Sequence, residues 1–475
     1  MDTMIKENGF TFKELEKIIF QRSCEASRKY TKELLEEYDR QLMEKRDKRY
    51  YRHKGKRKTT IKTIYGEVEY HRAIYEIQKP EVGKRYVYLL DETLELENIG
   101  TISTYLTEHL VSGITEMSYR ECAKKVSEMT GQSISAMGVW NVIQSLGKKV
   151  DEEEKKLVKA HKAGTVTGEK EAPVLFEEAD GVYLNLQGRD RKKQGHRRAE
   201  MKVAIAYAGW KKTGKERYAL EGKVITAGFT DAKDFHERRE AAIAKEYNLA
   251  ETDVRLLNAD GASWIRKVKD KSTHYQLDPF HKNKAVKENI PHREAARRVQ
   301  ELLNKNAIEE MFSYLRIYKD SLSDDQEIEK VEGLYKYFTN NKEGLIPYQE
   351  RGINLPANPD GLEYRSMGTM ENHVWSVIAK RMKHNHTSWS RAGGNNLSKI
   401  LSKKCCGRLS EVTERIKKPI FSVDVVNESE EKIILSGSMP TKSGKGYEYP
   451  LMGHMVGLEM ALRGERKKMW SMAGY

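Results

Sequence analysis

The sequence has few cysteines and no long apolar run, and these two absences exclude several classes of protein. Cys24, Cys122, Cys405 and Cys406 are too few among 475 residues for a disulfide framework, and none belongs to the CxxC pair of a zinc ribbon. No apolar stretch approaches the roughly 18 residues that a membrane-spanning helix needs. The first residues, MDTMIKENGF, lack the pattern of a secretory signal peptide. We therefore expect a cytoplasmic protein without structural disulfides.

Positive charge is in excess over negative charge. The sequence has 85 Lys and Arg against 71 Asp and Glu, which gives a formal net charge of +14 and an isoelectric point near 9.2. A charge of this sign and size favours a polyanionic partner, with nucleic acid ahead of a membrane surface. Hydrophobic residues are 38% of the chain, enough for globular cores, and the length predicts roughly two to four domains.

The N-terminal part combines a long helix, a basic segment and a β-hairpin. Thr11 and Glu14 have the spacing of a capping box, and an approximate apolar stripe follows them. Residues 45–58 (KRDKRYYRHKGKRK) carry nine Lys or Arg against the single acid Asp47, and the alternating segment after them predicts a hairpin around Gly66. Such a run is either a solvated linker or a phosphate-contacting surface. The candidate DNA contacts in it are Lys45, Arg46, Arg49, Arg52, Lys54, Lys56, Arg57 and Lys58.

A second helical region begins at about residue 95. Ser118 and Glu121 form another capping box, and a second helix is expected over 134–146 with Trp140 on its inner face. Two helices joined by a short glycine-containing turn are a helix-turn-helix candidate, although an ordinary helical hairpin has the same pattern. The polar residues that could read base edges are Gln132, Ser135, Asn141 and Gln144.

Beyond residues 151–172, which are charged and then rich in Gly and Thr, the pattern becomes that of an α/β domain. We expect three strands at 174–187, 199–210 and 216–229, followed by a helix at 231–249 and a strand at 253–261. A helix at 262–270 and a final strand at 272–277 complete the expected order. This order predicts a mixed sheet. A charged helical stretch follows from Asp278 to about residue 351, and the tail ends in a predicted helix near 451–463.

Three carboxylates stand where a negative charge is costly. Asp180 lies inside an apolar strand, and Asp260 ends a later strand directly before Gly261. Glu371 shares a helical stripe with Val374 and other apolar residues, so we expect it to face inward. Buried carboxylates that converge repel one another unless a cation holds them, and an all-oxygen ligand set suits Mg²⁺ or Mn²⁺.

Each of these acids also has an ordinary structural explanation. Asp260 could be a turn residue, and Glu371 could stabilise the start of its helix through the helix dipole. Lys202 on the neighbouring strand could pair with Asp180. The joint pattern is more specific, because acids on the first strand, after the fourth strand and on a late helix recur in the ribonuclease-H-like fold with two-metal phosphodiester chemistry.

Several segments, taken together, resemble the ISLre-type insertion-sequence transposases, a DDE family distantly similar to Mutator-type transposases. The similar segments are RDKRYYRHKGKRKTTIKTIYGEVEYHR near the N-terminus, ADGVYLNLQ at 179–187, NADGASWI at 258–265, LDPFHKNKA at 277–285 and GTMENHVWSVIAKRMKHNHTSWS at 368–390. The resemblance extends from about residue 40 to about residue 400.

The resemblance implies that Asp180, Asp260 and Glu371 are the catalytic acids and hold two Mg²⁺ or Mn²⁺ ions. Asp278 and His281 match the Asp-x-x-His form of a signature that Mutator-like enzymes carry between the second Asp and the Glu, which makes both possible supports of the site. Three basic residues lie one turn beyond the apolar face of the Glu371 helix and could hold phosphates beside the site. They are Lys380, Arg381 and Lys383.

The expected architecture is an α/β protein with a ribonuclease-H-like catalytic domain. That domain would span 173–400 with a helical insertion at about 284–350, after an N-terminal unit at 1–94 and a DNA-binding helical region at 95–150, and before an α+β tail at 401–475. The expected function is a transposase that cuts the ends of a mobile element and joins them to target DNA, as a homo-oligomer on DNA. The alternatives are a metal-dependent nuclease that does not join strands, and a transposase-derived DNA-binding protein.

Overall fold

The computed structural model describes residues 11–79, 83–94, 102–195, 197–266, 273–384 and 386–413. The tail from residue 414 onward, including the helix predicted at 451–463, lies outside the described residues. In the part that is described, no helix is long and apolar enough to cross a membrane.

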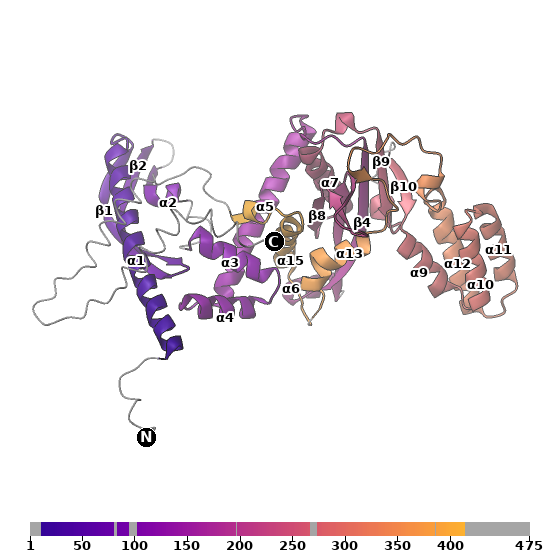
Figure 1. The fold of residues 1–475 in the computed structure, drawn as a ribbon, viewed down its shortest axis with the longest axis horizontal. Coiled ribbons are helices and arrows are strands. Elements are labelled where there is room, and N and C mark those ends of the chain that lie inside the picture. The colour runs from indigo at the N-terminus through magenta and orange to yellow at the C-terminus, as the bar shows by residue number, and fades with distance from the viewer. Residues whose placement is uncertain are drawn as a thin grey trace, which may run out of the picture. The chain divides into compact units, whose positions relative to one another are not determined.

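The N-terminal part is a long helix packed against a small antiparallel sheet (Figure 1). The predicted capping box at the start of α1 (Phe12–Lys45) is confirmed, because Thr11 and Glu14 bond each other's backbone amides. The sheet order is β1 (Tyr51–Thr63), β2 (Gly66–Lys79) and β3 (Gly83–Val87). The linker alternative for the basic segment is therefore wrong for its second half, which forms most of β1.

Helices follow the first sheet, and the second predicted capping box, between Ser118 and Glu121, is also confirmed. The helices are α2 (Leu89–Thr93), α3 (Thr104–Ile114), α4 (Tyr119–Thr130) and α5 (Ala136–Lys162). Gly131 ends α4 at a φ of 66°, a conformation that glycine adopts without strain. Helix α5 continues through residues expected to connect two domains, and Trp140, predicted to face inward, is 40% exposed.

The prediction of a mixed sheet is confirmed, but the predicted order of elements is confirmed only in part, because a short helix follows the first strand and the predicted strand 216–229 is divided between two sheets. Its elements are β4 (Val174–Asn185), α6 (Gly188–Gln194), β5 (Arg198–Tyr207), β8 (Val224–Gly228), α7 (Ala232–Glu246), β9 (Val254–Ala259), α8 (Ser263–Arg266) and β10 (Thr273–Leu277). The strand order is β10-β9-β4-β5-β8, in which β10, β9 and β4 are parallel and the other neighbours are antiparallel. A smaller sheet consists of β11 (Leu362–Glu363), β6 (Gly209–Lys212) and β7 (Tyr218–Glu221).

Helices cover both faces of the main sheet because its strands carry apolar side chains on both sides. Phe235 of α7 shares a core with Ala204 of β5, whereas Leu397 of α15 (Arg391–Cys405) shares a core with Val203 on the opposite face. Helix α5 contacts both α7 and α15 (Figure 1). That contact includes a buried cation, since Arg238 of α7 ion-pairs with Asp151 of α5 at 2.9 Å.

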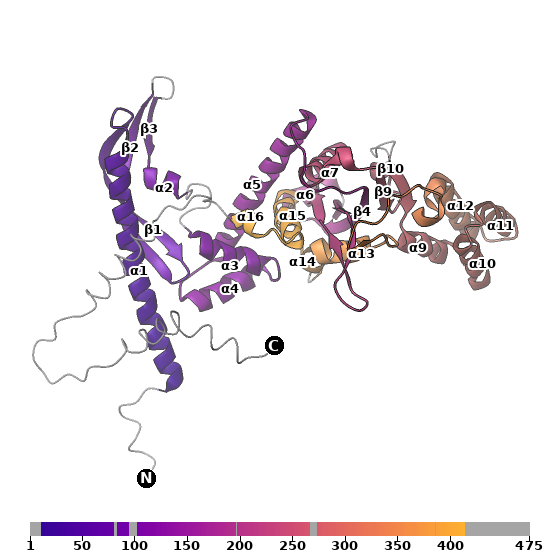
Figure 2. The same ribbon diagram turned by 45° about the horizontal axis from the view of Figure 1, so that its top comes forward.

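The charged helical stretch predicted after Asp278 is present and packs with β10 in one apolar core. It contains α9 (Pro279–Asn289), α10 (Arg293–Asn304), α11 (Ile308–Asp320) and α12 (Asp325–Asn340). The chain then returns to β4, where both views place α13 near that strand (Figure 2). There α13 (Met370–Val374) continues as the π-helical turn Trp375–Ala379 and as α14 (Lys380–Met382).

Candidate metal centre

Asp180 is the buried acid of the central strand. It lies on β4 with 7% of its surface exposed, and its Oδ1 accepts a hydrogen bond from the amide of Gly181 at 2.7 Å. Lys202 does not pair with it, because Lys202 lies opposite Gly181 in the register and donates to the carbonyl of Thr230 at 2.8 Å. Alternate residues of a strand point to opposite faces, so the sequence-based pairing of Lys202 with Asp180 is wrong.

Two residues that are remote in sequence approach Asp180. Asp180, His281 and Glu371 each have one potential ligand atom (a carboxylate oxygen or an imidazole nitrogen), and these three atoms lie within 4.8 Å of one another. His281 lies on α9, with its Nε2 3.7 Å from Asp180 Oδ2, and Glu371 lies on α13. Two carboxylates and an imidazole can hold a divalent cation, and the imidazole makes the set better suited to Mn²⁺ than a purely oxygen set would be.

Asp260 adjoins this group but is not one of its members. The parallel register that pairs Ala179 with Ala259 places Asp180 and Asp260 one step further along neighbouring strands. Its Oδ1 accepts a hydrogen bond from the amide of Ala262 at 2.8 Å, so the turn role considered from the sequence is real. Burial raises the pKa of Asp260, and the negative charge of Asp180 raises it further, which indicates that the two carboxylates interact.

His281 is a histidine that approaches this acidic cluster, with its Nε2 3.7 Å from Asp180 Oδ2. The adjacent Asp180 carboxylate raises the pKa of the His281 imidazole, and burial opposes the increase. Among the residues that the structure describes, no Lys or Arg forms an ion pair with Asp180, Asp260 or Glu371. Several carboxylates with one histidine leave an excess of negative charge, and a divalent cation would offset it.

Glu371 is exposed, so the prediction that it faces inward is wrong. The helix does not keep a regular 3.6-residue period, because its π-helical turn begins at Trp375 and adds a residue to that turn. Val377 and Ile378 are consequently both fully buried, whereas Trp375 is 49% exposed. Glu371 and Trp375 therefore share the open face of the helix rather than its core face.

Glu178 is a buried acid that the sequence reasoning missed. It lies on β4 two residues before Asp180, and none of its surface is exposed. Burial raises the pKa of Glu178, against hydrogen bonds from Tyr207, Thr369 and Asn258 that favour its charged form. The available indication was the run Glu177-Glu178-Ala179-Asp180, in which two acids two residues apart share one face of an apolar strand.

Some of the predicted DNA contacts of the basic segment are held by hydrogen bonds or ion pairs, and others are exposed. Arg46 donates to the carbonyls of Met43 and Tyr51 at the end of α1, so it supports the fold. The ion pairs Arg49–Asp47, Lys54–Glu76 and Lys58–Glu69 measure 3.1, 2.8 and 2.7 Å. The exposed basic side chains that remain are Lys45, Arg52, Lys56 and Arg57.

The polar helix residues predicted to contact DNA are also partly exposed and partly packed within the fold. Asn141 is exposed on α5, but Gln144 accepts a hydrogen bond from Asn396 of α15 at 2.8 Å. Gln132 is 9% exposed and donates to the carbonyl of Thr63, so the prediction that it could read base edges is wrong. These contacts assign Gln144 and Gln132 to the packing of the fold.

The basic residues beyond Glu371 are not equivalent. Arg381, predicted to hold phosphate, is 9% exposed and its Nε donates to the carbonyl of Ile114 at 2.7 Å, so it is a packing residue instead. Lys380 is exposed and ion-pairs with Glu116 at 3.0 Å, and Lys383 is exposed.

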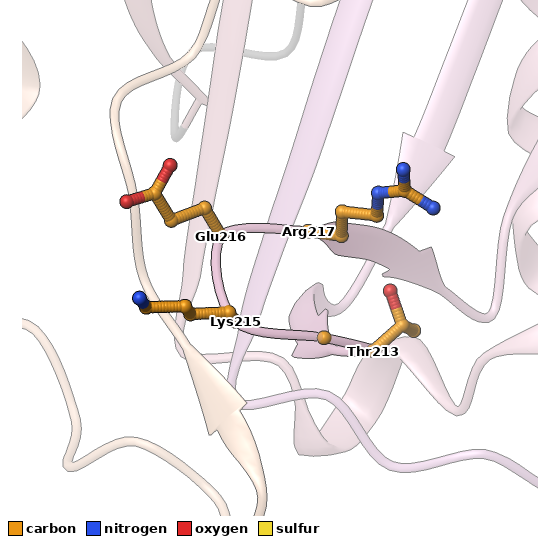
Figure 3. A pocket seen from close by; sticks show the side chains of 5 residues that line it. Thr213, Lys215, Glu216 and Arg217 are labelled. Atoms are coloured by element: carbon orange, nitrogen blue, oxygen red, sulfur yellow. The ribbon is translucent and has the colours of Figure 1, made fainter.

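A surface hollow at the turn between β6 and β7 lies outside this centre. It is lined by Thr213–Arg217, whose side chains surround the turn in Figure 3. None of the centre's acids and no histidine contributes to its lining, so it adds nothing to the candidate metal centre.

Comparison with known proteins identifies relatives without an assigned activity. The model of an uncharacterised protein family, UPF0236, matches residues 5–418. Two UPF0236 proteins of Caldanaerobacter subterraneus subsp. tengcongensis are each 26% identical to this chain, over 374 and 375 residues, and in each case the match covers 77% of this chain and 72% of the relative. A Streptococcus gallolyticus protein named "UPF0236 protein in vanSb 3'region" is 22% identical over 375 residues, 76% of each chain.

These findings correct the family resemblance drawn from the sequence. The matching family is UPF0236, and neither its description nor the names of these relatives mention a transposase or a DDE enzyme. The motifs that suggested the ISLre-type family are therefore segments of a UPF0236 chain, and any activity has to be argued from the site itself.

Proposed function

Because this chain belongs to the uncharacterised protein family UPF0236, whose description assigns no activity, we propose a function from its own site. The proposal is metal-dependent phosphoryl transfer on DNA by a transposase of a bacterial-type insertion sequence, acting in the cytoplasm. The observation that carries it is the approach of Asp180, His281 and Glu371 to within 4.8 Å, beside Asp260. These residues are about a hundred positions apart in sequence, so only the fold brings them together.

The proposed fold of the catalytic domain is ribonuclease-H-like, over 173–400 with α9–α12 as its helical insertion. The mixed order β10-β9-β4-β5-β8 supports this proposal. The carboxyl end of β9 lies beside the middle of β4, so Asp260, directly after β9, is next to Asp180. Ligand sites in α/β sheets gather at the carboxyl ends of parallel strands such as β9.

The residues of the centre have separable tasks in the proposed reaction. Asp180, His281 and Glu371 would hold a divalent cation, and Asp260 would add a carboxylate for a second one. When bound, Mg²⁺ or Mn²⁺ supplies a lowered pKa for the attacking hydroxyl and stabilisation of the leaving oxygen. The exposed position of Glu371 leaves the centre open on one side, as a substrate of the size of DNA requires.

The names of the relatives agree with a mobile element. The names of the two Caldanaerobacter proteins join eleven and four locus designations, respectively. Repeated loci for one protein within one organism are what an element leaves when it moves to new positions. A nuclease that only cuts DNA gives no reason for such multiplication, which favours transposition over plain cleavage.

The proposed partner is DNA, and strand β1 supplies a surface for its phosphates. We expect the double substitution Arg52→Ala/Arg57→Ala to weaken DNA binding for all sequences alike. Each lost phosphate contact lowers the slope of log affinity against log salt by about 0.9, so the slope should fall by about 1.8. Fluorescence anisotropy across a salt series measures this change.

The matched control for this prediction is Arg297→Ala/Lys305→Ala, which removes two exposed charges from α10 and its C-cap and leaves β1 unaltered. If the slope of log affinity against log salt is unchanged in the Arg52/Arg57 variant, or changes equally in the control, β1 is not part of the surface that binds DNA.

The function itself is tested with purified protein, Mn²⁺ or Mg²⁺, and DNA that contains the ends of the element. Short inverted repeats that flank the gene identify those ends. Cutting at the ends followed by joining to a target plasmid supports a transposase. Cutting without joining supports the nuclease alternative, and binding without either reaction supports a transposase-derived DNA-binding protein.

A further inference from the structure

A buried polar row adjoins the candidate metal centre on the same face of the sheet. Glu178 on β4 pairs in register with Asn258 on β9, which pairs in turn with Gln276 on β10. Their exposed fractions are 0%, 0% and 4%. Because side chains of a strand alternate between faces, this row shares its face with Asp180, two residues further along β4.

The Glu178 carboxylate accepts hydrogen bonds from the segment that begins α13. The backbone amides of Gly368, Thr369 and Met370 donate to its Oε2 at 3.1, 2.9 and 3.1 Å, and the Thr369 hydroxyl donates to its Oε1 at 2.7 Å. Glu371 is the residue that follows the last of these amides. The start of the helix that carries Glu371 is therefore fastened to β4 through one side chain.

The same row is joined to α9, the helix that carries His281. The side-chain amide of Asn258 donates to Glu178 Oε2 at 3.0 Å and to Asp278 Oδ2 at 2.6 Å. Asp278 in turn caps α9, since its Oδ1 accepts a hydrogen bond from the backbone amide of His281 at 3.2 Å. One buried network thus contacts both helices that bring ligands to β4.

We infer that Glu178 is a positioning residue of the metal centre: its carboxylate holds the start of α13, and through Asn258 the cap of α9, against the strand that carries Asp180. The inference rests on the proposed metal-dependent function. Without this carboxylate, several buried donors lose their acceptor, and Glu371 can move away from Asp180 although neither ligand is altered. Groups that orient metal ligands typically change metal affinity or activity by about 10–100-fold when mutated.

The test compares Glu178→Ala with Glu177→Ala in the full-length protein. Glu177 is the matched control, because it precedes Glu178 on β4, is 1% exposed, faces the opposite side and ion-pairs with Arg255 at 2.7 Å. Mn²⁺ affinity is measured by electron paramagnetic resonance, and hydrogen exchange of residues 366–372 is measured without metal. We expect Glu178→Ala to weaken Mn²⁺ binding about 10–100-fold and to accelerate that exchange, and Glu177→Ala to change neither.

Two further variants keep the test decisive if Glu178→Ala does not fold. Glu178→Gln retains an acceptor oxygen and should recover most of the Mn²⁺ affinity, whereas Thr369→Val removes one donor and should weaken Mn²⁺ binding. Wild-type affinity in a folded Glu178→Ala or in Thr369→Val, or an equal loss in Glu177→Ala, would overturn the inference. If the wild-type protein binds no Mn²⁺, the proposed function fails, and the exchange comparison still decides whether Glu178 fastens α13.

Discussion

Asp180→Asn should abolish metal-dependent cutting and joining of DNA while leaving DNA binding unchanged. The amide keeps the size of the side chain and its acceptor for Gly181, but it removes the charge at the point where His281 and Glu371 converge. A loss of about 10²- to 10³-fold or more is expected, the size found when a group that stabilises developing charge is removed. Product formation at saturating Mn²⁺ gives the loss, and an anisotropy titration gives the affinity for DNA.

The matched control for Asp180→Asn is Glu310→Gln, an exposed acid in the first turn of α11. It removes one negative charge from the chain without altering the centre, so both cutting and binding should remain. If an Asp180 variant still joins strands at the wild-type rate, Asp180 does not take part in the reaction.

Arg238→Met should cost the protein about 1.5–3 kcal/mol of unfolding free energy, because it removes a buried cation that donates hydrogen bonds to Asp151, Glu154 and Asp234. The Arg238 side chain is 3% exposed and its Nη1 lies 2.9 Å from both Asp151 and Glu154 of α5. Glu154 also pairs with Lys399 of α15 at 2.7 Å, so the acids join three helices around the sheet. Urea denaturation followed by circular dichroism measures the change.

Arg297→Met is the comparison for that loss. Its side chain is 82% exposed, and it pairs with Glu301 one turn along α10 at 3.2 Å. An exposed pair of this kind contributes about 0.3–0.5 kcal/mol, so the two arginines should differ about fivefold in their effect. Similar losses for Arg238 and Arg297 would mean that the α5–α7 contact does not depend on the buried cation.

The sequence predicted those parts of the fold that depend on local chemistry. Capping boxes at Thr11 and Ser118 act within one turn, and alternating apolar residues mark β4 and β5 within a few positions, so both were correct. The irregular helix after Glu371 was not predictable in the same way. Its π-helical turn depends on tertiary packing around Val377 and Ile378, and a regular period assigns the wrong face to Glu371 and Trp375.

The candidate centre was predictable only in part for a similar reason. Asp180 was recognisable because an acid within an apolar strand is costly wherever the strand packs. Glu178 was equally costly, but its hydrogen-bond partners lie 29 to 192 residues further along the chain, so the sequence does not indicate which groups satisfy its carboxylate. Arg381 and Gln144 were misjudged because their partners, Ile114 and Asn396, are also distant in sequence.

The most direct measurement is the position of Mn²⁺ in crystals of the protein, located by anomalous scattering. We predict a peak at coordination distance, about 2.0–2.3 Å, from Asp180, His281 and Glu371, with Asp260 beside it. Crystals soaked in Mn²⁺ with no peak at these side chains, or with the ion bound elsewhere, would contradict the assignment of this site to phosphoryl transfer.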